Sequence, residues 1–525
     1  MGEGMETQLD HLTRSELLRL GAGAALSSSA IGGILSAAPA AAAATPKRGG
    51  TFVVGMIGGG SSESIDPNKE FNETDIARVY QLYERLVTYD RHGKPVNQLA
   101  KEFTPNKNAT VWKMKVLPNV HFHDGSLLTA ADIVYSLRWM ATHKAAAGYS
   151  DVKSAFITAK GVRALDKSTV EFRLSAPNAI LPTSLAARTI WIFKNGMTDF
   201  TKPNGTGPFK YKSFKPGENS VFVRNDLYRL HGGPYLDAVQ ITSFSSASSC
   251  FNAVASGSTM AMSDIDFTFV PLVKSNPKLR LLVSDHGGGT TDFTMACNLP
   301  PFNNVKVRQA FRLLTDRKTM VANALSGNGT IANDLFWPTD PDYASALPQR
   351  QYDPEKAKSL LKAAGHANLK TTLYTSTIEV GQIASAEILQ ADAKKIGVTI
   401  NFNKVAADVY YSDKYLKAPF GQSGWSLRPL PTQFAQVLSS SAPYNETHWY
   451  NKRFDSLVNQ AKRQLNPAKR KELLVEAQKM LYNEGGYIIW GNYKNVDAVA
   501  KNVQGLQSAD DRWLGAYNFR NVYLS

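Results

Sequence analysis

Residues 101–140 constrain the fold most, because they predict a strand, a tight turn and a capped helix in succession. Apolar and polar side chains alternate over residues 111–116, which is the period of a strand with one buried face. An Asp-Gly pair then closes a turn, since glycine adopts positive φ without steric cost. Thr129 and Asp132 have the spacing of a capping box, and apolar residues follow at helical intervals. The stretch therefore predicts a half-buried strand followed by a helix with one buried face.

Similar patterns predict elements elsewhere in the chain. Residues 51–55 are typical of a short strand, and residues 75–90 of a packing helix, because apolar side chains recur at helical spacing. A turn cluster at 204–208 introduces a two-stranded hairpin. A later helix is expected after the segment PPFNN, with Val305 among its apolar residues. Another helix is expected to be capped by Asp353 and to end at Gly365.

Two motifs suggest chemistry without completing a site. His121, His123 and Asp124 offer metal-ligand types at strand spacing, but a closed site needs about four ligands and no other His or Cys lies nearby. Glycines 58–60 are not followed by GK[ST], so a phosphate loop is not expected there. We therefore expect no metal and no cofactor, and interpret the His-Asp segment as a strand end and turn.

The two cysteines, Cys250 and Cys297, leave a choice open. An oxidising compartment would permit a disulfide, but the sequence does not say whether their Cα atoms approach within bonding distance. Both lie in apolar or helical context, which favours two buried free thiols. Neither has the His partner and basic setting that a nucleophilic thiolate needs.

The first 44 residues have the pattern of an export signal. Arg14 and Arg19 precede a run rich in Ala, Gly and Ser, which ends in A-x-A cleavage choices at 40–44. Ser15 stands where a twin-arginine signal has its second arginine, so the route stays open between Sec and twin-arginine export. An uncleaved membrane anchor is the alternative, but a spanning helix would be more apolar. No Cys lies near the cleavage region, so we expect a soluble periplasmic protein and no lipoprotein.

The composition limits the classes of partner. The formal net charge of +15 raises the question of nucleic-acid binding. The basic residues are spread along the chain and no zinc-finger or RNP-type motif occurs, so no nucleic-acid partner is expected. The charge indicates a solvated surface that favours anionic ligands or membranes. At 525 residues, two or three domains are expected.

Three segments carry a resemblance to a known family. FHDG at 122–125, GTGPF at 205–209 and the pattern PF…VRQA…DR at 301–317 resemble the extracytoplasmic solute-binding proteins of peptide-type ABC importers, family 5. The resemblance covers about residues 47–525. It implies an α/β, two-lobed periplasmic binding protein of type II, with an extra subdomain inserted in the first lobe and a hinge of two crossing strands. It also implies solute binding without catalysis, so no enzyme and no catalytic residue is expected.

The same resemblance implies how the segments divide between the lobes. Glycines 287–289 interrupt a strand pattern, as a crossing between lobes requires, and a second crossing is expected at 491–495. The expected division is 1–44 export signal, 45–75, 191–288 and 493–525 lobe I, 76–190 its inserted subdomain, and 289–492 lobe II.

The resemblance also implies candidate ligand contacts. Ser61, Ser62 and Glu63 follow the first strand, in a loop that lies at the cleft in the family; an ordinary flexible loop is the alternative. In relatives that bind free peptides, a Trp is followed three residues later by an Asp that pairs with the peptide ammonium. Here Trp425 is followed at that place by Arg428.

The reversed charge argues against an ordinary free-amino peptide. A guanidinium suits a carboxylate or phosphate, so Trp425 is expected to stack on the ligand, with Ser426 beside it and Arg428 holding an anionic group. The solute is then a peptide derivative, an opine-like or carboxylated compound, or an acidic glycoside. A structural salt bridge of Arg428 at the cleft rim is the alternative.

The expected function is therefore that of the periplasmic substrate-binding component of an ABC importer. A monomer captures a small solute by lobe closure and delivers it to a membrane permease and its ATPase subunit; no P-loop lies in this chain. A secreted hydrolase is the rival class, but no GxSxG, HExxH or SxxK with supporting motifs occurs. A role as a ligand-presenting partner of a chemoreceptor could coexist with transport.

Overall fold

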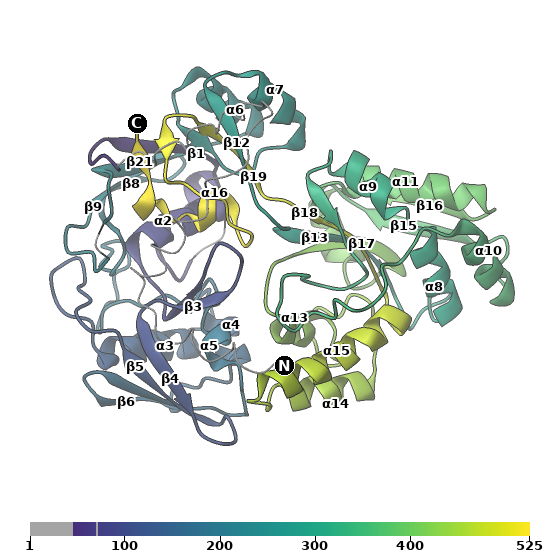
Figure 1. The fold of residues 1–525 in the computed structure, drawn as a ribbon, viewed down its shortest axis with the longest axis horizontal. Coiled ribbons are helices and arrows are strands. Elements are labelled where there is room, and N and C mark those ends of the chain that lie inside the picture. Colours follow the sequence, from purple (N-terminus) through teal and green to yellow (C-terminus); the bar gives the residue numbers. More distant parts are fainter. Residues whose placement is uncertain (1–45, 70–71, 231) are drawn as a thin grey trace, which may run out of the picture. The chain divides into compact units, whose positions relative to one another are not determined.

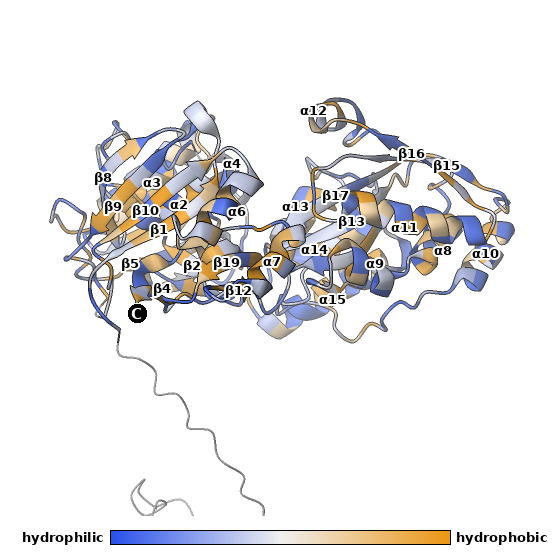
Figure 2. Cartoon of the chain, turned by 90° about the horizontal axis from the view of Figure 1, so that it is seen from above, coloured by the Kyte–Doolittle hydropathy of each residue, from blue (hydrophilic) through white to orange (hydrophobic). Residues whose placement is uncertain are grey.

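The computed structural model describes residues 46–69, 72–230 and 232–525. The predicted export signal, residues 1–44, lies outside the described residues. The described chain forms three main sheets with helices packed on them (Figure 1). Figure 2 shows apolar residues concentrated on central strands such as β9 and β10.

Lobe I is built on a seven-stranded sheet that joins distant parts of the chain. Its first strand, β1, lies parallel to β10 and buries Phe52, Val54 and Met56. Because β19 comes from the C-terminal region, the sheet is complete only when the chain has returned from the other lobe. In spatial order the strands are β12 (Leu279–Val283), β19 (Val496–Ala500), β11 (Ala261–Met262), β1 (Thr51–Ile57), β10 (Ala238–Phe244), β9 (Asn219–Arg224) and β8 (Phe209–Lys215).

The strand and capped helix predicted over residues 101–140 are confirmed. β5 (Val111–Val116) buries alternate residues, and α3 (Ala130–Thr142) begins with the capping box, in which the Asp132 carboxylate accepts the Thr129 N–H at 2.8 Å. They belong to a subdomain with a separate core. Its sheet runs in the order β4 (Ala100–Pro105), β5, β7 (Thr169–Arg173) and β6 (Val162–Asp166).

Lobe II is built on a six-stranded sheet covered by helices such as α8 (Val305–Leu314), α9 (Arg317–Ala324), α10 (Pro354–Ala363) and α11 (Gln382–Lys395). The predicted cap of α10 is confirmed, because the Asp353 side chain accepts from Lys356 N–H at 2.9 Å. In spatial order the strands are β14 (Gly329–Ile331), β18 (Tyr487–Tyr493), β13 (Gly289–Met295), β17 (Phe420–Ser426), β15 (Lys370–Thr375) and β16 (Thr399–Lys404).

Two adjacent segments connect the lobes, as the predicted fold class requires. The chain leaves the seven-stranded sheet after β12 and enters the six-stranded sheet at β13; it returns between β18 and β19. The crossings hydrogen-bond to each other: Gly288 N–H donates to the Tyr493 carbonyl at 2.6 Å and Ser284 N–H to the Asn495 carbonyl at 3.0 Å. The Asn495 N–H in turn donates to Ser284 Oγ at 3.0 Å. The hinge is therefore one bonded pair of strands, not two independent linkers.

One local prediction was wrong. The helix predicted over 75–90 ends early, since α2 spans Glu73–Leu82 and residues Val87–Tyr89 form strand β2. The segment at 205–207 packs against the helix end, where Gly207 N–H donates to the Leu82 carbonyl at 3.0 Å and closes the helix.

We expect Gly288→Ala to destabilise the protein, because the crossings approach too closely for a side chain. A Cβ at this buried position would lie 1.9 Å from Asn495 Oδ1 and 2.5 Å from its Cγ. Overpacking of this kind typically costs about 1–3 kcal/mol. Urea unfolding followed by circular dichroism measures the change. A variant as stable as the wild type would contradict the tight pairing of the crossings.

Candidate functional site

The strand β17 and the loop after it place Trp425, Ser426 and Arg428 at the edge of lobe II. β17 is held in register by β13, where Trp425 lies opposite Thr290. The Trp425 indole is half-buried, and its Nε1–H donates to Glu446 Oε2 at 3.2 Å. The guanidinium of Arg428 lies over the Trp425 ring at 4.9 Å from its centroid. The structure therefore brings the predicted Trp and Arg together as a stacked pair.

The guanidinium of Arg428 is held without an ion pair. It donates from Nη1 to Gln436 Oε1 on helix α13 (Leu430–Val437). Within the described ranges, no acidic side chain comes within salt-bridge distance of it. Burial lowers the pKa of Arg428 to about 10, while the more distant Asp151 carboxylate acts in the opposite direction. A salt bridge at the cleft rim, the alternative considered from the sequence, is thus absent from this part of the structure.

Arg428 lines a cavity of about 320 Å³ between residues of the two lobes. Lobe II contributes the loop that carries Ser426 and Arg428, together with Gln436. Lobe I contributes three further guanidinium groups and two carboxyl groups. These are Arg85, Arg188, Arg512, Asp151 and Asp511.

The guanidinium groups of that cavity are only partly neutralised by carboxylates. Arg512 and Arg188 share one carboxylate, Glu73, at 2.6 Å and 3.4 Å. Arg85 bonds only neutral oxygens and lies over the Tyr80 ring. Burial raises the pKa of Asp511, against the opposing charges of nearby arginines. The cavity is therefore a positively charged space suited to an anionic group.

A second cavity, of about 280 Å³, lies on the other side of the Arg428 loop. It is also formed between the lobes, with His92 and Asp511 from lobe I and Trp337, Asp340 and Arg428 from lobe II. Burial raises the pKa of Asp340 to about 6. A larger cavity of about 430 Å³ is lined by lobe I residues, Arg85 among them, and by none of the contacts predicted from the sequence.

A smaller pocket of about 170 Å³ lies within lobe II beside Trp425. Glu379 and three tyrosines line it, and Glu446 and Asp292 are buried behind it. Burial, then the charges of Asp264 and Glu446, raise the pKa of Glu379 to about 7. Burial also raises the pKa values of Glu446 and Asp292. The pocket is therefore acidic in residue type, but burial favours the neutral form of its carboxyl groups. The tyrosines are Tyr410, Tyr411 and Tyr415.

Glu63 has a structural position in lobe I, not the cleft position expected from the sequence. Its side chain is fully buried and pairs with Arg78 Nη2 at 2.8 Å. It also accepts backbone N–H groups of Gly217 at 2.9 Å and Gly59 at 3.1 Å. The carboxylate is thus occupied in fixing the glycine loop after β1.

Ser61 and Ser62 lie in a single 3-10 turn and are exposed. The Ser62 hydroxyl donates to the Gly59 carbonyl at 2.9 Å. Neither serine lines one of the cavities described above. The structure does not bring them together with Trp425 and Arg428.

Two other features singled out from the sequence, the His-Asp segment and the two cysteines, lie in structural parts of the protein. Both ring nitrogens of His123 face backbone groups, Gly207 O at 3.2 Å and Gly205 N at 3.4 Å, and burial lowers the pKa of His123 to about 4. Cys250 is buried and Cys297 half-buried, and both are free thiols.

Sequence reasoning missed most of the lobe I side of the site. Arg85 and Arg188 lie more than 200 residues before Arg428 and Arg512 more than 80 residues after it, and no local motif marks them.

None of the helices in the described ranges combines the length and apolar character needed to cross a bilayer.

Comparison with known proteins supplies the family. The model of "Bacterial extracellular solute-binding proteins, family 5 Middle" matches residues 94–446. The glutathione-binding protein GsiB of Pectobacterium atrosepticum is 25% identical over 86% of this chain and 91% of its own. Heme-binding protein A of Haemophilus influenzae is 26% identical over 78% of this chain and 82% of its own.

Solved structures agree on the fold. The ABC transporter substrate-binding protein CtaP of Listeria monocytogenes superposes with a TM-score of 0.80 at 21% identity, over 91% of this chain and all of CtaP. The family match spans well over half of the chain, and the two-lobed fold and the paired crossings accord with it. This chain belongs to the bacterial extracellular solute-binding proteins of family 5, which serve ABC importers.

Proposed function

We propose that this protein captures a small organic solute that carries a carboxylate or phosphate, and that Arg428 binds this anionic group. The observation that carries the proposal is the Arg428 guanidinium, which stacks on Trp425, lines two inter-lobe cavities and has no acidic partner in the described ranges. A half-buried guanidinium without a counter-ion loses hydration without compensation. A ligand carboxylate would supply two charge-assisted hydrogen bonds.

The surroundings of Arg428 favour an anion over a cation. Arg85, Arg188 and Arg512 line the same cavity, and Glu73 is shared between two of them. The ammonium of a free peptide would be repelled here, since Arg428 stands in the place of the peptide-binding Asp. The carboxyl groups nearest to Trp425, those of Glu446 and Glu379, have pKa values raised by burial. The glutathione and heme named for two relatives both carry carboxylates, which agrees with an anion-binding role.

The Trp425 face would supply the apolar contact for the solute. The ring is half-buried and is fixed on one side by Glu446 and Tyr444. Ser426 lines the cavity next to it. We therefore propose Trp425, Ser426 and Arg428 as ligand contacts. Arg85 and Arg512 of lobe I are included because they line the same cavity as Arg428.

The binding cycle is an equilibrium between open and closed lobes. The solute binds one lobe, and closure about the two crossings expels water and surrounds the solute with polar groups. A dissociation constant of about 1 μM corresponds to roughly −8 kcal/mol. The closed monomer would then dock on the permease, whose ATPase subunit drives import. Catalysis plays no part, so the hydrolase alternative is set aside.

The cellular location of the protein and the boundaries of its lobes are part of the same proposal. We assign residues 1–44 to an export signal and the rest to the periplasm. Residues 45–75, 191–288 and 493–525 make lobe I, residues 76–190 its inserted subdomain and residues 289–492 lobe II.

We expect Arg428→Ala to weaken solute binding by at least about tenfold, because loss of a buried charge partner typically costs 2–5 kcal/mol. The solute is first identified by mass spectrometry of molecules released from gently purified protein. Isothermal titration of that molecule then compares the wild type, Arg428→Ala, Arg428→Lys and the control Arg453→Ala, an exposed arginine of lobe II paired with Glu476.

Arg428→Lys should bind with intermediate affinity, since a lysine keeps the charge but not the fork of donors. Arg453→Ala should bind as the wild type does. Unchanged affinity of Arg428→Ala, or a released solute without any acidic group, would overturn the proposal.

We expect Glu379→Gln to stabilise the empty protein at pH 8 and not at pH 4.5. Burial raises the pKa of Glu379 from 4.5 to about 7, so the folded state prefers the neutral acid. Its contribution is fully present below pH 4.5 and is lost as pH rises through 7. A glutamine is neutral throughout, so the variant should gain about 1–3 kcal/mol relative to the wild type at the higher pH.

Urea unfolding at the two pH values measures this difference. Glu355→Gln, in the exposed first turn of α10, is the control and should show no such gain. An equal effect of Glu379→Gln at both pH values would contradict a protonated acid in the pocket beside Trp425.

A further inference from the structure

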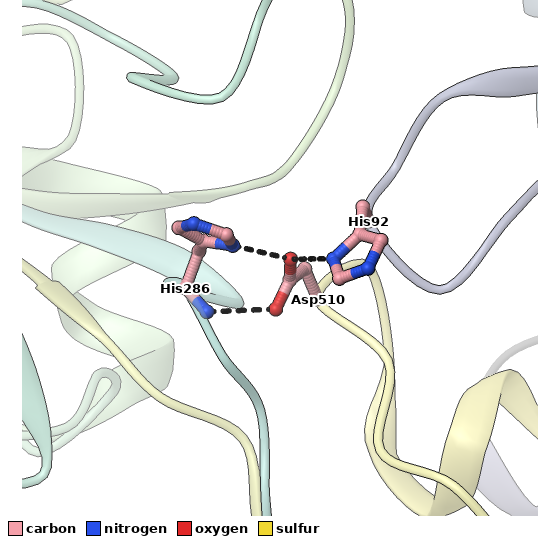
Figure 3. Close-up of side chains that lie close together, drawn as sticks. All are labelled: His92, His286 and Asp510. Carbon is pink, nitrogen blue, oxygen red and sulfur yellow. Dashed lines mark hydrogen bonds and ion pairs between the residues drawn. The ribbon is translucent and has the colours of Figure 1, made fainter. Parts of the chain in front are cut away.

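Three side chains from distant parts of the chain meet beside the hinge. His92 lies in the turn between β2 (Val87–Tyr89) and β3 (Pro95–Asn97), His286 lies in the first crossing, and Asp510 precedes the short helix α16 (Trp513–Ala516). Figure 3 shows the two imidazoles on opposite sides of the Asp510 carboxylate. One ligand atom from each residue lies within 4.8 Å of the other two. His92 also lines the 280 Å³ inter-lobe cavity, but none of the three side chains is among the solute contacts proposed above.

The distances are close to those of a metal site. His286 Nδ1 lies 2.8 Å and His92 Nδ1 3.7 Å from the same atom, Asp510 Oδ2. Zinc bonds to nitrogen and oxygen are about 2.0–2.2 Å, so neighbouring ligands of a tetrahedral ion lie about 3.3 Å apart. The two observed distances bracket that value. Each nitrogen is therefore within about half an ångström of the separation from Oδ2 that a shared ion requires, and an ion would also draw the two imidazoles, whose ligand atoms lie within 4.8 Å, toward each other.

The carboxylate is held in a fixed position and one of its oxygens is already satisfied. The Asp510 side chain is 1% exposed, and its Oδ1 accepts the His286 N–H at 2.8 Å. Its peptide is fixed as well, since Asn495 Nδ2 donates to the Asp510 carbonyl at 3.3 Å and Asp510 N–H donates to the Arg91 carbonyl at 2.8 Å. Oδ2 is left facing both imidazoles. A rigid carboxylate whose second oxygen faces two imidazoles is a well-placed anionic ligand.

The histidines are placed for entry of an ion. Their side chains are 47% and 52% exposed, so the rings can turn without disturbing a packed core. The neighbouring guanidinium of Arg91 is engaged by Asp285 at 2.6 Å and not by Asp510, and Asp285 Oδ2 also lies 3.8 Å from His92 Nδ1. The cluster therefore keeps its negative charge available to an incoming ion.

We propose that His92, His286 and Asp510 form a binding site for a divalent transition-metal ion of the Zn²⁺ class, with a fourth position open to solvent. Two neutral imidazoles and one carboxylate are the ligand types that such ions take, and three protein ligands leave a coordination position free. The ion would join the first crossing, the C-terminal segment and the β2–β3 turn. Metal binding would thereby stiffen the hinge on the lobe I side.

The test uses tag-free full-length protein, because a polyhistidine tag would bind the same ions. After treatment with chelator and dialysis, ZnCl₂ is titrated by calorimetry. The cobalt(II) ion then serves as a spectroscopic probe, since tetrahedral coordination gives intense visible absorption. The variants are His92→Ala and His286→Ala, with His366→Ala in lobe II as a control outside the cluster. His92→Ala is the safest variant for folding, because the ring is half exposed.

We expect one Zn²⁺ per chain with micromolar or tighter affinity and a rise in melting temperature on zinc addition. Each cluster variant should lose at least about tenfold in affinity, and His366→Ala should bind as the wild type does. Zinc binding that is millimolar, or that is unchanged in both His92→Ala and His286→Ala, would overturn the proposal and leave the cluster as a hydrogen-bonded His–carboxylate contact.

Discussion

The pairing of the two crossings is the constraint on which the rest of the structure depends. Each lobe has its own sheet and core, so the bonds from Gly288 to Tyr493 and between Ser284 and Asn495 decide how the lobes are joined. Two strands that bond to each other bend together and resist independent twisting. Such a hinge permits closure along a limited set of directions, which a site assembled from both lobes requires.

Buried charge has two different roles in this molecule. In lobe I, Arg78 is fully buried against Glu63 and Asp75, and in lobe II Asp334 is buried among three arginines. Removing one partner from such clusters leaves an uncompensated charge, so they hold the fold together. Arg428 differs because its guanidinium meets only an amide and an aromatic face. The contrast between paired and unpaired arginines supports the role proposed for Arg428 better than charge alone does.

Local pattern predicted the elements well and the site only in part. The β5 strand, the capped α3 and the cap of α10 could be predicted because their causes lie within a few residues. Helix α2 was predicted too long, because the GTG segment that closes it lies more than 100 residues away. Glu63 was assigned to the cleft because its partner Arg78 gives no sequence signal of pairing. Contacts between distant segments, such as those of Arg512 and His286, have no local signature at all.

The short segment 510–512 connects these distant contacts. Asp510 faces the first crossing through His286, Asp511 lines both inter-lobe cavities, and Arg512 binds Glu73 at the start of α2. Successive residues therefore contact the hinge, the solute space and the core of lobe I. Because the segment is tied at all three points, a displacement of the crossing on closure would also move the carboxyl and guanidinium groups that face the solute. If the solute binds as proposed, its charge and the hinge position would be coupled through three consecutive residues, and lobe closure would depend on what the cavity contains.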